Sequence, residues 1–203
     1  MCWRPLPPTT RARATRVTSL PDLVAAWAGT AYRHIPADAG YDIRDLRFAG
    51  RRSDGRWHWR GQPTLYLASD AGVAIGEFAR HLAVDRGGAV VPARRTIYEL
   101  GARIERAIDL RDPAVLRLIG RDDAPGCWLD PRIARAVATF YRDSLGVQAL
   151  LVPSVVHLDD AGRFNVVGFL ENLPAAPRAF LPRARRRATV SVEPEPPETD
   201  PAG

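Results

Sequence analysis

The sequence predicts a single domain of the α+β class, in which small mixed β-sheets are flanked by helices. Brief apolar runs with β-branched members predict short strands. Apolar stripes at helical spacing follow Ser, Asp or Asp-Pro, which favour helix starts. The length of 203 residues suits one domain, and a hydrophobic content of 46% is enough to build a core.

The composition of the two ends differs from that of the middle. Residues 1–18 hold three prolines, four arginines and little periodicity, which predicts a flexible arm. Residues 19–173 carry the periodic segments and are expected to form the folded domain. Residues 174–203 are Pro-rich, basic and then acidic, a composition that predicts a disordered tail.

In the first half of the domain we expect a helix, a strand and a second helix. The first helix is expected between Ser19 and Gly29, with a proline in its first turn. The apolar run Thr64–Ala68 predicts a strand. Ser69 or Asp70 can then cap the second helix.

In the second half, strands and helices are expected in the order strand, helix, helix, strand, strand. Thr96–Ile104 keeps apolar residues close to a strand pattern, and Asp112-Pro113 and Asp130-Pro131 each open a helix. Ala149–Val156 and Val166–Leu170 predict two buried strands. The apolar stripe of the longer helix is expected to hold Ile133, Ala136, Val137, Phe140 and Tyr141.

Charge and cysteine content narrow the class of protein. The formal net charge is +6 and all 29 basic residues are Arg, which suits an anionic partner such as a nucleic acid, a dinucleotide or an acidic protein. Cys2 and Cys127 make no disulfide framework, and no Cys/His spacing predicts a zinc site. No apolar run approaches the ~20 residues of a membrane span, so we expect a soluble, cytoplasmic protein.

The candidate site is centred on Glu77. At about 100° per residue, this acid lies roughly a third of a turn from the apolar stripe of its helix, and therefore beside the core face. The preceding strand carries Tyr66, and the loop before that strand carries Arg56. An acid, an arginine and a phenol are thus expected at one place. The alternative is a solvated glutamate on the flank of a helix.

Four ordered blocks carry a family resemblance. They are Tyr32-Arg33-His34, then Gly55-Arg56-Trp57-His58 with Gly61-x-Pro63-x-x-Tyr66, then Ala74-x-x-Glu77, and finally Val152-Pro153-Ser154. Their order and spacing from about Tyr32 to Glu171 resemble the RES domain, which is named for its Arg, Glu and Ser. RES proteins are toxins of toxin–antitoxin pairs that destroy NAD, and their fold resembles that of the ADP-ribosyltransferases.

The resemblance makes residues 19–173 a RES-like catalytic domain with a set of expected site residues. Glu77 would hold the ribose 2′-hydroxyl and stabilise the cation, Arg33 would reach the site from the first strand, and Ser154 would orient the acid or the arginine. The residues expected to bind substrate are Arg56, Tyr66, Trp57 and His58. No metal and no cofactor are expected: NAD is the substrate, and inorganic phosphate is an optional co-substrate.

These residue types suit cleavage of the nicotinamide–ribose bond. The transition state is an oxocarbenium-like ribose, as in glycoside hydrolysis. Such a reaction needs a carboxylate near the ribose, cations for the pyrophosphate and an aromatic platform for nicotinamide. We therefore expect an NAD glycohydrolase or NAD phosphorylase.

Each assignment has a structural alternative. Arg33 could form an ion pair with Asp42, Asp45 or Glu77, and Arg56 could be a surface arginine. Tyr66 could pack in the core, and the Ser154 hydroxyl could satisfy a bulged backbone.

Two other functions remain open. The first is transfer of ADP-ribose to a macromolecule, although Ile75 stands where such transferases usually carry a further acid or Gln. The second is a basic nucleic-acid-binding module, because Trp57 and Trp59 adjoin Arg56 and Arg60.

The resemblance also predicts partners. NAD is the expected small molecule, and an antitoxin with a helix-turn-helix part that binds DNA is the expected protein. DNA would be contacted only through that antitoxin, and no membrane is expected. Whether the chain forms a homodimer is left open by the sequence.

Overall fold

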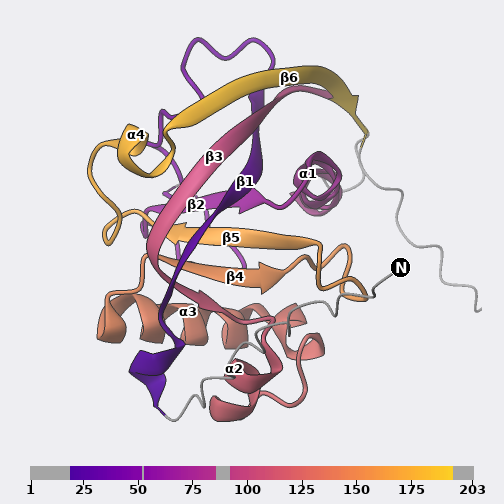
Figure 1. Cartoon of the computed structure of the whole chain (residues 1–203). Coiled ribbons are helices and arrows are strands. Elements are labelled where there is room, and N and C mark those ends of the chain that lie inside the picture. The colour runs from indigo at the N-terminus through magenta and orange to yellow at the C-terminus, as the bar shows by residue number, and fades with distance from the viewer. Residues whose placement is uncertain (1–18, 52, 86–91, 194–203) are drawn as a thin grey trace, which may run out of the picture.

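The centre of the fold is a six-stranded sheet that curls until two of its strands meet (Figure 1). The computed structural model describes residues 19–51, 53–85 and 92–193. The strand order is β1-β2-β5-β4-β3-β6, and β1 also pairs with β3, so five strands close on themselves and β6 extends the sheet beyond β3. The strands are β1 (Ala25–Pro36), β2 (Thr64–Ala68), β3 (Ala93–Asp109), β4 (Ala149–Pro153), β5 (Phe164–Phe169) and β6 (Arg183–Val192).

Helices cover the outside of this closed sheet. In Figure 1, α3 and α2 lie below β4, α1 lies to the right of β1 and β2, and α4 lies near the start of β6. The helices are α1 (Ala71–Asp85), α2 (Pro113–Leu118), α3 (Pro131–Leu145) and α4 (Pro177–Phe180), with 3-10 turns η1 (Leu20–Leu23) and η2 (Gly126–Leu129). The mixed α and β class predicted from the sequence is confirmed.

Strand alternation divides the apolar residues between an inner and an outer core. Leu65 and Leu67 of β2 and Leu151 of β4 point into the closed sheet, where they pack together. Leu150 and Val152 point outward and pack under α2, α3 and η2. Residues of β2, β4 and β5 that face outward are therefore the ones that a helix outside the sheet can reach.

Aspartates begin three helices, as the sequence predicted for each. Asp70 Oδ1 accepts from the backbone N–H of Val73 at 2.9 Å at the start of α1. Asp112 and Asp130 accept from the backbone N–H two residues ahead, each at 2.8 Å, before prolines that begin α2 and α3. These side chains satisfy N–H groups that have no partner within the helix.

The predicted helix between Ser19 and Gly29 is wrong. Only η1 is helical there, and β1 begins at Ala25. The reason lies in the partner strand: from Trp27 to Pro36, β1 pairs with β3 residue by residue, and this long ladder outweighs the local helical pattern.

The stripe expected on α3 is displaced. The buried residues of this helix are Ala134, Ala138, Tyr141 and Arg142, whereas Phe140 is 44% exposed. The two alanines let α3 approach the sheet closely. The guanidinium of Arg142 lies 4.4 Å from the ring centroid of Phe169, and its Nη2 donates to Thr64 Oγ1 at 2.7 Å.

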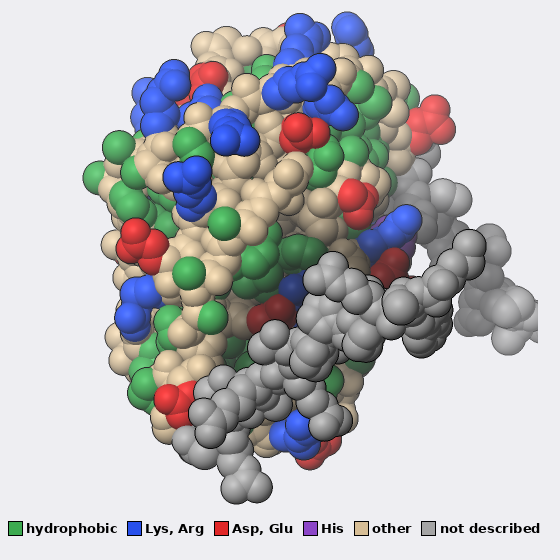
Figure 2. Space-filling view, viewed as in Figure 1, with side chains coloured by type: hydrophobic (Ala, Val, Ile, Leu, Met, Phe, Trp, Pro, Cys, Tyr) green, Lys and Arg blue, Asp and Glu red, His purple; other side chains and the backbone are tan. Residues whose placement is uncertain are grey.

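The expectation of disorder after residue 174 is also wrong for the part that the structure describes. Phe180 and Leu181 are buried in the inner core, and β6 pairs with β3 along most of its length. The arginines of β6 stay exposed, and Figure 2 shows basic side chains gathered over this strand at the top of the molecule. Backbone pairing with β3 thus orders β6, although most side chains of β6 bury little apolar surface. Residues 1–18 and 194–203 lie outside the described residues.

The packing of this C-terminal segment can be tested at one side chain. We expect Leu181→Ala to lower the free energy of unfolding by about 2–5 kcal/mol, because it leaves a cavity in the inner core. Arg178→Ala, at an exposed position of α4, is the control and should change it by less than about 0.5 kcal/mol. Urea unfolding of both variants is the measurement. Equal stability of the two variants would contradict the placement of Leu181.

Candidate active site

Glu77 of α1 is tied by hydrogen bonds to the outer face of the sheet. Its Oε1 accepts from Ser154 Oγ at 2.7 Å, from Asn165 Nδ2 at 3.0 Å and from the backbone N–H of Val155 at 3.1 Å. These donors come from the ends of β4 and β5. The carboxylate is partly buried and ties α1 to these two strands.

Ser154 lies where β4 stops. Its backbone N–H donates to the carbonyl of Arg163 at 3.0 Å, and its hydroxyl also accepts from the backbone N–H of Val156 at 3.3 Å. The side chain is completely buried. Its hydroxyl proton is therefore directed to Glu77, so the serine serves as a hydrogen-bond donor to the acid.

Close packing of α1 against this turn depends on Gly76. A Cβ added there would lie 3.3 Å from Val156 Cγ1, which is tighter than ordinary contact. The absence of a side chain at this position lets the helix approach the turn that carries Ser154 and Val155.

Arg56 lies within electrostatic reach of Glu77. Its Nη1 donates to the carbonyls of Trp128 and Leu129, each at 2.8 Å. Burial lowers the pKa of Arg56, the charge of Arg80 lowers it further, and the charge of Glu77 raises it. Arg80 follows Glu77 by three residues on α1, so the two side chains lie on one side of the helix. The acid therefore has two arginines nearby.

The hydroxyl of Tyr66 is held by the same loop. It accepts from the backbone N–H of Trp57 at 3.2 Å and lies 2.9 Å from His58 Nδ1. Burial, and then the charge of Arg142, lowers the pKa of His58. The tautomer of the imidazole sets which of Nδ1 and the phenol donates in this bond. The pKa of Tyr66 is raised by burial.

Trp57 and His58 do not present their rings to a ligand, which corrects the expectation that they bind substrate. Trp57 is 3% exposed, and its ring centroid lies 5.3 Å from that of Trp128 in the outer core. His58 is 5% exposed and supports Tyr66. Trp57 therefore offers no stacking surface, whereas Trp59, the other tryptophan of the nucleic-acid alternative, is 45% exposed.

Arg33 is not brought to Glu77, which corrects the expectation that it reaches the site from the first strand. It follows Tyr32, whose ring packs against α1, so alternation turns the arginine to the inner face of β1. There Arg33 Nη1 donates to the carbonyl of Ile43, which belongs to the inner core. Burial lowers the pKa of Arg33.

Asn165 and Arg80 are the contributions to this region that the sequence did not indicate. Asparagine is depleted in strands, so an isolated Asn in the apolar run of β5 was the signal that could have indicated Asn165. For Arg80 the signal was its spacing of three residues from Glu77 on a helix.

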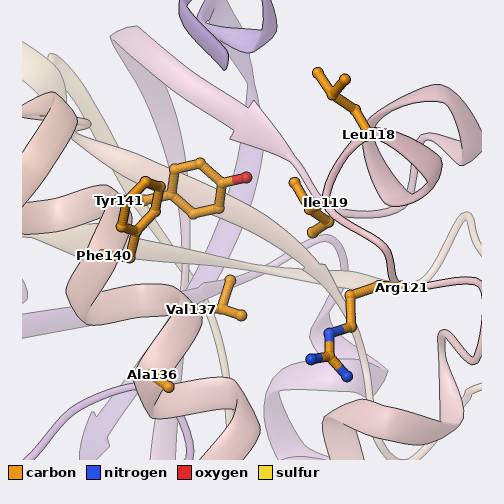
Figure 3. Close-up of a pocket in the computed structure, with 7 residues that line it drawn as sticks. All are labelled: Leu118, Ile119, Arg121, Ala136, Val137, Phe140 and Tyr141. Atoms are coloured by element: carbon orange, nitrogen blue, oxygen red, sulfur yellow. The ribbon is translucent and has the colours of Figure 1, made fainter. Parts of the chain in front are cut away.

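A separate cavity of about 430 Å³ lies between α2 and α3 (Figure 3). None of the predicted site residues lines it. The lining is mostly apolar and consists of Leu118, Ile119, Arg121, Ala136, Val137, Phe140 and Tyr141. In the part of the chain that the structure describes, no group of three or more His, Cys, Asp or Glu side chains could hold a metal ion. No described helix has the length and apolar character needed to cross a bilayer.

Comparison with known proteins agrees with the motif blocks. The RES domain family matches residues 30–191, and the chain belongs to this family. Among solved structures, the fold is similar to a chain of the M. tuberculosis MbcT–MbcA toxin–antitoxin complex. The TM-score is 0.54 and the identity 22%, over 84% of this chain and 87% of that chain. No curated protein matches the sequence.

The loop that holds Tyr66 can be tested at Gly55. A Cβ there would collide with the His58 ring and lie 2.8 Å from Tyr66 Oη. We expect Gly55→Ala to lower the free energy of unfolding by about 1–3 kcal/mol. Gly40→Ala adds a Cβ with no atom within 4 Å and should be neutral or slightly stabilising. Thermal unfolding distinguishes them, and a Gly55→Ala protein as stable as the control would refute this close approach.

The contact between α1 and β1 predicts a pH dependence of stability. Arg95 Nε donates to His34 Nδ1 at 3.0 Å, and the His34 ring packs on Phe78, next to Glu77. Burial, together with the charges of Arg95 and Arg33, lowers the pKa of His34 from 6.5 to about 3. Between these values the unfolded chain binds a proton that the folded chain does not. Stability from this group is therefore complete above pH 6.5 and is lost as the pH falls toward 3.

The matched variant for this test is His34→Asn, which keeps an acceptor for Arg95 and removes the titration. We expect the wild-type free energy of unfolding to fall more steeply below pH 6.5, by up to about 1.4 kcal/mol per pH unit. Urea unfolding from pH 7 to pH 4 measures both slopes. Parallel slopes would show that His34 does not titrate in this way.

Proposed function

We propose that this chain is an enzymatic toxin that removes nicotinamide from NAD and is neutralised by a cognate antitoxin. Its family and its likeness to a chain of a toxin–antitoxin complex support the toxin role. The observation that carries the enzymatic role is the carboxylate of Glu77, which three donors fix and which has Arg56 within electrostatic reach.

The proposed chemistry assigns one task to each charged group. Departure of nicotinamide leaves positive charge on the ribose, and the fixed carboxylate of Glu77 stabilises this charge as it develops. Arg56 binds the pyrophosphate, because a guanidinium pairs well with phosphate oxygens. Arg80 is the second cation for the pyrophosphate, in place of Arg33, which the sequence had suggested.

The acceptor completes the reaction in one of two ways. Water gives ADP-ribose, nicotinamide and a proton, whereas inorganic phosphate gives ADP-ribose phosphorylated at the carbon that held nicotinamide. The antitoxin is proposed to carry a helix-turn-helix part and a segment that covers Glu77, so that DNA is contacted only through this partner.

The test is release of nicotinamide by the purified protein, free of antitoxin, with and without phosphate. We expect nicotinamide together with one of the two ADP-ribose products. Nicotinamide release with ADP-ribose attached to a protein instead would identify a transferase. A folded protein that releases no nicotinamide under either condition would refute the proposal.

Glu77→Gln is the decisive variant in this assay. It keeps an oxygen for the three donors but loses the charge, so we expect nicotinamide release to fall at least about 100-fold. The free energy of unfolding should change by no more than about 1–2 kcal/mol. Glu77→Ala is a poorer test, because it leaves three donors unpaired and destabilises the fold. Glu105→Gln, at an exposed acid of β3, is the control and should keep full activity.

A further inference from the structure

The two oxygens of Glu77 have different surroundings. Ser154 Oγ, Asn165 Nδ2 and the backbone N–H of Val155 all donate to Oε1. Among the residues whose side chains the structure describes, no donor binds Oε2. A carboxylate oxygen offers about two lone-pair directions, so three donors fill the capacity of Oε1. The carboxylate cannot turn over without breaking these bonds.

Asn165 is placed to make this contact and little else. It stands on β5 opposite Ala68 of β2 and Val152 of β4, both of which are buried and apolar. Val166, the next residue, points into the inner core, so Asn165 faces outward toward α1. An amide between two apolar neighbours is a poor choice for packing. Within the described part of the chain, the hydrogen bond that this side chain makes goes to Glu77.

The other two donors to Glu77 both come from the turn after β4, so the Asn165 amide holds the carboxylate from another side. The Val155 donor is backbone and comes from the turn that follows β4. The Ser154 hydroxyl also accepts from the backbone N–H of Val156, which belongs to the same turn. Asn165 is the donor that comes from a different strand, β5, so it fixes the carboxylate from a second direction.

From this geometry we infer that Asn165 is a positioning residue for the reaction proposed above, and that Oε2 is the oxygen of Glu77 that faces the ribose of the substrate. This inference rests on the proposed function. With Oε1 held by three donors, the acid meets the developing charge through one defined atom. Loss of the Asn165 donor lets the carboxylate turn, which weakens contact with the transition state more than it weakens binding of NAD.

The test is the kinetics of nicotinamide release by Asn165→Asp and Asn165→Ala. The first keeps the shape of the side chain, removes the donor and places an acid beside Oε1. The second removes the amide without adding a charge and serves if the first does not fold. We expect kcat to fall about 10- to 100-fold in Asn165→Ala and further in Asn165→Asp. KM for NAD should stay within about twofold, because Arg56 is unchanged.

Asn172→Ala is the matched control. Asn172 is also partly buried, and its amide donates to the carbonyls of Arg142 and Val147 at 2.9 and 2.8 Å, away from Glu77. This variant should lose stability but keep the wild-type kcat for each folded molecule. If Asn165→Ala keeps the wild-type kcat, or loses no more than Asn172→Ala, the inference is overturned while the proposed function stands. If the wild-type protein itself releases no nicotinamide, both are overturned.

Discussion

The contact between the Glu77 carboxylate and the ends of β4 and β5 is the constraint on which this structure depends. An ionised group that leaves water needs hydrogen bonds in return, and three donors supply them here. Those donors exist because β4 stops at Pro153 and because β5 carries a polar residue on its outer face. The position of α1, the turn after β4 and the register of β5 are thereby linked through one oxygen atom.

The elements that the sequence predicted are those with strong local signals. The strand Thr64–Ala68 and the helix starts at Asp112 and Asp130 follow from alternation and from capping, which act over a few residues. The start of β1 and the whole of β6 were missed because both are ordered by pairing with β3. A local pattern does not reveal a partner that lies 60 or more residues away along the chain. His34 and Arg95, which are 61 residues apart and hydrogen-bonded, are one example.

The site shows the same division. Glu77 and Ser154 came from the resemblance, and their contact is visible in the structure. Trp57 and Arg33 have the residue types expected of a site. Trp57 instead packs into the outer core from the turn before β2, and Arg33 points to the inner face of β1. Residue type and order along the chain do not determine the face that a side chain occupies when a sheet closes on itself.

The separation along the chain of Glu77 from its donors has a consequence for biosynthesis. Ser154 follows the acid by 77 residues and Asn165 follows it by 88. A ribosome that has delivered α1 must therefore translate β3, α3 and both later strands before the carboxylate is held. A polypeptide interrupted anywhere in that interval contains the acid without the groups that orient it. Assembly of this centre therefore requires translation to have passed the start of β5.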